Sequence, residues 1–188
     1  MAATDSFSSL RHHFLIAMPA LKDTPFEHSI TYICNHDGEG AMGIVLNQPT
    51  DLNLHEVLDQ LEIEGAHGHD HTVLLGGPVH QDHGFILHTE KGDWRSTLSV
   101  ADDIHVSTSK DILTSLAQGT GPKKYKVALG YAGWDPGQLE QELLDNSWIT
   151  VEADEDIIFN MPADQMYQAA LKLLGIDEGF LSSDAGHA

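Results

Sequence analysis

The residues best suited to chemistry in this sequence are Cys34, the chain's single cysteine, and His36 two positions later. A thiol beside an imidazole can act as a nucleophile or a redox-sensitive group, because a nearby imidazolium favours the thiolate. An uninterrupted strand would place both side chains on one face. Cys34 also alternates with Ile30 and Tyr32, which predicts a thiol that faces the core. Two interpretations stay open, a core thiol or a reactive one, and we assign no catalytic residue.

A second group with possible chemistry is the histidine-rich segment 64–72. His67, His69 and His71 stand at alternate positions, and in an extended segment alternate side chains share a face that three imidazoles could offer to one divalent ion. The segment is rich in glycine, however, and ordering such a loop costs conformational entropy. We therefore expect a flexible loop with weak metal affinity, and no resident metal or other cofactor.

Glycines and aromatic residues gather in two motifs, at 76–78 and 130–134. The first lacks the spacing and the lysine of a phosphate-binding loop. The second stands at a predicted strand-to-helix junction, where free N–H groups can receive an anion, although tight packing explains the same residues. The candidate ligand or partner residues are Gly76, Gly77, Pro78, Tyr131, Gly133 and Trp134.

The charge balance argues against a nucleic-acid-binding protein. Nine lysines and arginines stand against 29 aspartates and glutamates, for a formal net charge of −20. Nucleic-acid binding gains much of its affinity from basic side chains that neutralise phosphates, and the densest basic run here is Lys123, Lys124 and Lys126. We expect no direct contact with nucleic acid, and a protein or a small molecule as the partner.

Other features of the sequence suit the cytoplasm. A single cysteine cannot form an internal disulfide, which agrees with a reducing compartment. The apolar run at 14–18 is too short for a signal peptide, and no run approaches the roughly 18 apolar residues of a membrane helix. We expect a cytoplasmic protein without a membrane partner.

The hydrophobic pattern predicts short strands with helices inserted between them. The predicted strands cover 14–18, 29–34, 41–47, 73–75, 85–88, 104–107, 125–131 and 148–151. Helices are predicted over 54–61 and 109–118, after Asp135 as N-cap with Pro136 in first position, and from Pro162 to the stop at Gly175. Because the strands cluster in hairpins, we expect an α+β fold in one domain over 1–188, with residues 1–9 frayed.

Ordered motifs along the chain resemble one known family. Segments 13–19, 40–43, 76–78, 84–88, 128–134, 137–140 and 185–188 read HFLIAMP, GAMG, GGP, GFILH, ALGYAGW, GQLE and AGHA. Taken in order, they are similar to the YqgE/AlgH family of bacterial proteins. The resemblance implies a branched, mostly antiparallel sheet that forms a pseudo-barrel with packed helices. It implies no established enzymatic activity, and the label of transcriptional regulator comes from the role proposed for one member in alginate production.

The sequence departs from the family at positions where charge matters. Relatives generally have arginine where this chain has His28 and His83. If those arginines bind an anion, imidazole would bind it only weakly near neutral pH, because it is mostly uncharged there. We expect a non-enzymatic regulatory or binding protein. The alternative is a thiol-based redox switch or enzyme centred on Cys34, which an exposed thiol beside a distant histidine such as His88 would favour.

Overall fold

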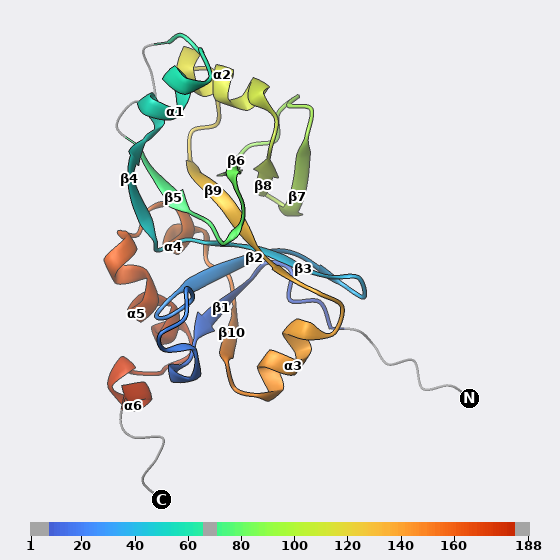
Figure 1. Cartoon of the computed structure of the whole chain (residues 1–188), viewed down its shortest axis with the longest axis vertical. Helices are drawn as coiled ribbons and strands as arrows, with labels where there is room; N and C mark the ends of the chain where they lie inside the picture. The colour runs from blue at the N-terminus through green and yellow to red at the C-terminus, as the bar shows by residue number, and fades with distance from the viewer. Residues whose placement is uncertain (1–7, 66–70, 183–188) are drawn as a thin grey trace, which may run out of the picture.

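The structure is a computed structural model and describes residues 8–65 and 71–182 (Figure 1). Its strands are β1 (His13–Ala17), β2 (Ile30–Asp37), β3 (Gly40–Val45), β4 (Pro49–Asn53), β5 (Thr72–Leu75), β6 (Val79–His88), β7 (Thr97–Ala101), β8 (Ile104–Ser107), β9 (Tyr125–Trp134) and β10 (Trp148–Glu152). Its helices are α1 (Leu54–Gln60), α2 (Lys110–Gln118), α3 (Gln138–Leu144), α4 (Glu155–Phe159), α5 (Ala163–Leu173) and α6 (Glu178–Ser182), with a 3₁₀ turn at Pro19–Leu21.

The sheet branches at β9, which crosses the middle of the molecule in Figure 1. The strand order is β10-β1-β2-β3-β9-β6-β8-β7, with β4 and β5 off this path. The end of β9 pairs with β3, and its first half pairs with β6 and, in parallel, with β5. All other pairs are antiparallel. The predicted α+β fold is confirmed. Within the described ranges the two edge strands of this path, β10 and β7, do not pair with each other, so the sheet does not close into a barrel.

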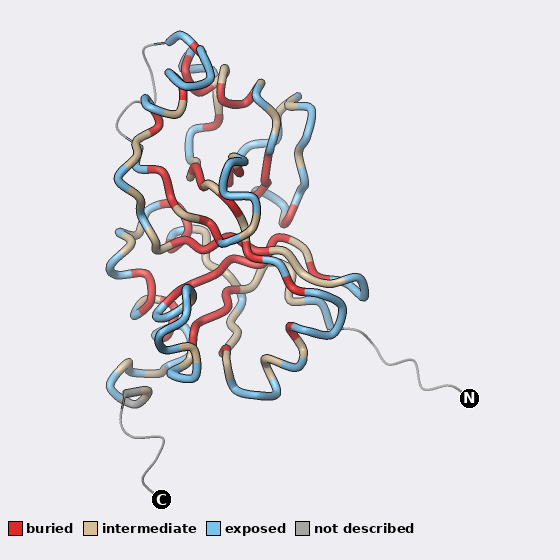
Figure 2. Tube along the Cα trace, in the orientation of Figure 1, coloured by how far each residue is buried: buried red, intermediate tan, exposed pale blue. Residues whose placement is uncertain are grey.

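Three hydrophobic clusters hold the helices against this sheet. The first packs α4 and α5 on β1, β2 and β3, and the second packs α1 and α2 on β5, β6 and β9. The third, which we call the α3 cluster, packs α3 on the opposite face of β1, β2 and β9. Figure 2 shows the buried residues concentrated along the strands that cross the centre. The branched sheet therefore buries apolar surface on both of its faces.

Local side chains decide where several helices begin. The side chain of Asn53 accepts the backbone N–H of Glu56 at 3.0 Å and caps α1. Asp154 caps α4 in the same way at 3.2 Å. The predicted start of α3 is two residues early, because Gly137 takes the N-cap position in a left-handed conformation (φ 79°) and the helix begins at Gln138. Among the helices that the structure describes, none is both long enough and apolar enough to span a bilayer.

Candidate functional site

Cys34 lies inside the first cluster and is fully buried, in line with Ile30 and Tyr32. Its thiol donates a weak hydrogen bond to the carbonyl oxygen of Tyr32 at 3.6 Å. Burial raises the pKa of the Cys34 thiol far above its ordinary value, and the charge of nearby Arg11 offsets only part of this rise. In the folded protein the sulfur is therefore inaccessible and the thiolate is strongly disfavoured.

A β-bulge separates Cys34 from His36. The register between β2 and β3 shifts between Ile33 and Asn35, so Cys34 is an extra residue on β2. Because side chains alternate along a strand, one extra residue exchanges the faces of everything that follows. His36 consequently lies opposite Ala41, whose side chain packs on the α3 cluster, while Cys34 faces α4 and α5. The structure does not bring the two predicted residues together.

His36 instead connects the start of the described chain to helix α3. Its Nδ1 accepts the backbone N–H of Leu10 at 2.9 Å, which leaves the proton on Nε2. This N–H donates to Oε1 of Glu140 at 2.5 Å. Burial alone would raise the pKa of the Glu140 carboxyl, but hydrogen bonds from its own backbone N–H and from His36 lower it overall. His36 is 5% exposed, and its hydrogen bonds hold the chain near Leu10 and helix α3 together, which is a structural role.

One of the three alternating histidines falls within the described chain. The ring of His71, just before β5, packs on Tyr125 with 4.3 Å between the ring centroids. His67 and His69 lie outside the described residues. Within 8–65 and 71–182 no group of three or more histidine, cysteine or acidic side chains is arranged to hold a metal ion. Weak metal affinity of segment 64–72 stays a prediction.

The glycines of the predicted ligand surface form a close crossing of two backbones. Gly76 and Gly77 are buried where the chain leaves β5 and passes β9. A Cβ atom on Gly77 would lie 2.1 Å from the carbonyl carbon of Tyr131, and one on Gly76 would lie 2.4 Å from the carbonyl oxygen of Gly130. Such distances are impossible for a real side chain. These two glycines therefore allow the sheet to branch.

The other residues of that predicted surface differ in their burial. Trp134 is 6% exposed, and its Nε1 donates to Oε1 of Glu142 at 3.2 Å. Pro78 and Gly133 are exposed, and Tyr131 is half-buried. Only these last three offer atoms to a ligand.

The structure reveals a serine–histidine pair that sequence reasoning missed. The carbonyl of Thr89 lies 3.0 Å from Nδ1 of His88 and can only accept, so Nδ1 holds the proton. Nε2 of His88 then accepts the hydroxyl of Ser107 at 2.7 Å. Both residues are fully buried, and the ring edge of Trp94 lies against His88. The pair joins β6 to β8 and is closed to substrates. Predicting this pair would require knowing how β6 aligns with β8, and the sequence does not show that alignment.

We expect mild acid to destabilise the protein through its buried histidines. Burial lowers the pKa of His88, and likewise those of His105 and His12. Imidazole in the unfolded chain protonates near pH 6.5, so below that pH the unfolded state binds more protons than the folded state. The free energy of unfolding should fall by up to about 1.4 kcal/mol per pH unit for His88.

Urea denaturation at pH 7 and at about pH 5.5 measures this loss. His88→Gln should reduce the difference between the two pH values, whereas His55→Gln, which changes an exposed histidine on α1, should retain it. An unchanged pH dependence in His88→Gln would contradict the assignment.

A cleft of about 740 Å³ lies between α1, α2 and the strands β6 and β9; we call it the α1–α2 cleft. Most of its wall is apolar, and polar side chains lie at its rim. The apolar lining residues are Leu52, Val57, Leu61, Phe85, Ile86, Leu113, Val127 and Leu129. The polar ones are Gln60, Gln81, Asp82, His83, Thr108 and Lys110. The residues of this cleft come from five elements, and no motif predicted that they converge.

One wall of the cleft is a four-residue bulge in β6. Val79 pairs with Tyr131 and Gly84 with Leu129, so residues 80–83 have no place in the ladder and leave the sheet opposite a single residue of β9. All four are exposed. His83, in place of the family's arginine, lies in this bulge with Nε2 3.8 Å from Oδ2 of Asp82.

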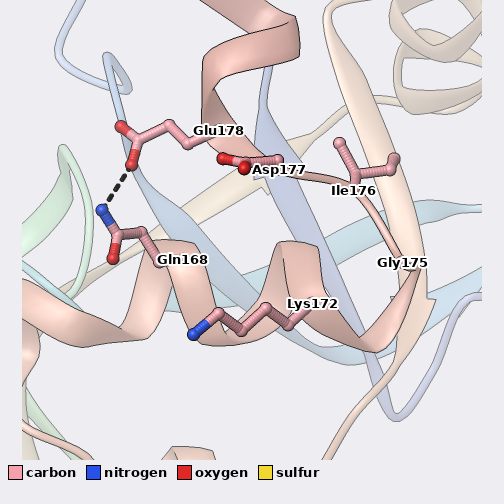
Figure 3. A pocket seen from close by; sticks show the side chains of 6 residues that line it. All are labelled: Gln168, Lys172, Gly175, Ile176, Asp177 and Glu178. Atoms are coloured by element: carbon pink, nitrogen blue, oxygen red, sulfur yellow. Dashed lines mark hydrogen bonds between the residues drawn. The ribbon is translucent and has the colours of Figure 1, made fainter.

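Other pockets in the described part of the chain are smaller than this cleft. A shallow cavity of about 500 Å³ lies beside the start of β3 and the end of β9. Another of about 390 Å³ lies between α5 and α6 (Figure 3). Figure 3 shows Gln168 and Glu178 already joined by a hydrogen bond of 2.8 Å across it. His28, the other arginine replacement, also approaches Glu178, with Nε2 3.3 Å from Oε1. Because its polar groups bind one another, this pocket is less suited to a ligand than the α1–α2 cleft.

Comparisons with known proteins agree on one family. The family model described as AlgH-like matches residues 14–179. A UPF0301 protein of Thioalkalivibrio sulfidiphilus is 52% identical over 189 residues and covers 100% of both chains. A UPF0301 protein of Saccharophagus degradans is 50% identical over 187 residues, covering 99% of this chain and 92% of its own.

Solved structures share the fold. The solution structure of the AlgH protein from Pseudomonas aeruginosa superposes with a TM-score of 0.82 at 44% identity, and covers 100% of both chains. A crystal structure of a Corynebacterium diphtheriae protein has a TM-score of 0.65 at 17% identity over 86% of this chain and 85% of its own, which shows the fold alone. This chain therefore belongs to the AlgH-like family, as the family model, the relatives of about 50% sequence identity and the shared fold together show.

Proposed function

We propose that this protein is a non-enzymatic regulatory protein of the bacterial cytoplasm that binds a small amphipathic ligand in the α1–α2 cleft. The observation behind the proposal is the cleft itself, a hollow of about 740 Å³ with apolar walls and a polar rim. Ligand sites in proteins commonly measure about 300–1,000 Å³ and combine a mostly apolar lining with a few polar groups that orient the ligand. The cleft fits both criteria.

The rim suggests how the ligand is oriented. Lys110 lines the cleft and is the first residue of helix α2, where the positive end of the helix dipole lies. Thr108, two residues earlier in the chain, also lines the cleft. A ligand with a polar or anionic head at Lys110 would place its apolar body against Val57 and Leu129. The head of the ligand would be stabilised by the charge of Lys110. The body of the ligand would be stabilised by the removal of its apolar surface from water.

The polar groups of the cleft support binding and not catalysis. Nucleophilic catalysis needs a hydroxyl or thiol in hydrogen-bond contact with a base. Among the described residues that line the cleft, no hydroxyl has such a bond to an imidazole or carboxylate. Cys34 and the Ser107–His88 pair lie in buried positions. A thiol switch would first require a conformational change that exposes Cys34.

The charge of the protein indicates how such a regulator would act. With a formal net charge of −20, the chain repels phosphate backbones. Regulation would therefore pass through the bound ligand and a protein partner, without direct contact to nucleic acid. The single cysteine fits the reducing cytoplasm.

The dye 8-anilinonaphthalene-1-sulfonate tests the cleft, because it has an apolar body and an anionic head. We expect one saturable site in the native protein. In Val57→Trp the indole fills the cleft, and we expect affinity for the dye to fall at least about fivefold, since each lost apolar contact weakens binding. Fluorescence titration measures the affinity, and near-ultraviolet circular dichroism verifies that each variant is folded, because partly folded states also bind the dye.

His55→Trp is the matched control, since it adds an indole to the exposed side of the same helix. It should retain the affinity of the native protein. Equal loss in both variants, or dye binding without saturation in the native protein, would contradict the proposal.

A further inference from the structure

The shallow cavity at the ends of β3 and β9 has an aromatic and apolar floor. It measures about 500 Å³, and Met42, Phe85 and Tyr131 lie in its lining. The ring of Tyr131 meets the edge of Phe85 at 5.4 Å and stacks with His80 at 6.0 Å between centroids. Gly133, two residues along the same strand, is exposed and has no side chain that could cover the Tyr131 ring. The cavity therefore exposes aromatic surface that a partner side chain could contact.

One carboxylate lines this cavity, and two more lie on the neighbouring hairpin tip. Asp135 lines the cavity and is exposed. Asp37 and Glu39 lie on the adjacent hairpin tip, whose Gly40 packs directly on the carbonyl of Trp134. No ion pair in the described part of the chain involves these three carboxylates. We call the set Asp37, Glu39, Met42, Phe85, Tyr131 and Asp135 the acid–aromatic patch.

The charge of the whole molecule adds to this local field. In the described residues one ion pair joins a lysine or arginine to a carboxylate, Lys124 with Glu155 at 3.6 Å. The other four pairs involve histidine. A protein with a net charge of −20 and so few internal pairs attracts cations over long range and repels anionic membranes and nucleic acids.

We propose that the acid–aromatic patch docks a basic segment of a partner protein. An arginine or lysine side chain joins an apolar stem to a cationic head. Its stem would lie on Met42 and Phe85, its head would meet the Tyr131 ring, and the carboxylate of Asp135 would pair with it. A cation–π contact and an exposed ion pair are each weak, so affinity comes from several basic residues together. This site shares Phe85 with the α1–α2 cleft, and its other lining residues are different.

The test uses a short fluorescein-labelled peptide of alternating arginine and glycine, titrated with the full chain at about 0.15 M ionic strength, where distant charges are largely screened. Fluorescence anisotropy reports the dissociation constant. Asp135→Asn should raise it by about threefold to fivefold, which is the loss of one exposed ion pair of up to about 1 kcal/mol. Gly133→Leu should do the same, because a Cβ there already lies 3.2 Å from the Tyr131 ring.

Asp51→Asn is the matched control, because it removes one negative charge from an exposed position on β4. It should change the dissociation constant less than about twofold, and thermal unfolding should show all variants folded. An equal effect of Asp51→Asn and Asp135→Asn would overturn the proposal, since only the overall charge would then matter. Equal binding of a peptide with glutamine in place of arginine would overturn it too. The dye titration of the cleft is unaffected by either result.

Discussion

Replacing Gly77 with alanine is expected to lower the free energy of unfolding by at least about 4 kcal/mol, enough to leave little folded protein. A Cβ atom there would lie 2.1 Å from the carbonyl carbon and 2.2 Å from the carbonyl oxygen of Tyr131. Both are backbone atoms of a central strand, so no flexible side chain can move aside. Relief would require the chain after β5 to move away from β9, and the Gly76–Leu129 hydrogen bond of 2.8 Å would be lost.

Urea denaturation followed by circular dichroism measures this loss, with Gly84→Ala as the control. Gly84 is also in the β6–β9 region, but no atom lies within 4 Å of where its Cβ would be. We expect Gly84→Ala to change the unfolding free energy by less than about 1 kcal/mol. Equal stability of the two variants would show that the crossing of backbones is looser than described.

Native Cys34 should react with a thiol reagent at least about a thousandfold more slowly than Cys34 in the denatured chain. The sulfur is fully buried and its pKa is raised, so reaction must wait for an opening that costs about 4 kcal/mol or more. Labelling with 5,5′-dithiobis(2-nitrobenzoate), with and without urea, measures the ratio of the two rates.

The variant Cys34→Ser gives a second measure of the same environment. It should cost about 1–3 kcal/mol, because a buried hydroxyl replaces a thiol whose only hydrogen bond is a weak one of 3.6 Å. Rapid labelling of the native protein, with an apparent pKa below the ordinary value of about 8.5, would instead make the thiol switch the leading hypothesis.

The strands that line the cores were predictable from the sequence, while the polar strands were not. Apolar alternation placed the strands that became β1, β2 and β9, and the α1 and α2 helices followed from their apolar periodicity. Strand β4 reads Pro-Thr-Asp-Leu-Asn, and the first half of β6 contains His-Gln-Asp-His. Strand β4 forms because β5 pairs with it, whereas residues 80–83 form the unpaired bulge within β6. Both outcomes depend on pairing with other parts of the chain, which the residue types of these segments do not show. Helix α4, which begins in an acidic run at Glu155, is not among the predicted helices, because five residues are too few to show a helical period.

The candidate site was predictable only in part. Alternation correctly placed Cys34 in the core, but no residue type marks the bulge between Ile33 and Asn35 that turns His36 to the opposite face. The glycines of the 76–78 motif were noted as a possible ligand surface, and their packing role became visible only when β9 lay across them. The α1–α2 cleft depends on residues between Leu52 and Leu129, whose convergence is a property of the tertiary structure.

Phe85 belongs to the lining of both the α1–α2 cleft and the shallow cavity of the acid–aromatic patch. A ligand that moves its ring, or the adjacent 80–83 bulge, changes the volume available on the other side. Occupancy of the two proposed sites would then be thermodynamically linked, and linkage works equally in both directions. A small molecule in the cleft would adjust the affinity for a basic partner, and the partner would adjust the affinity for the small molecule by the same factor. The shared wall would thus let the protein report the concentration of a metabolite as a change in its protein contacts.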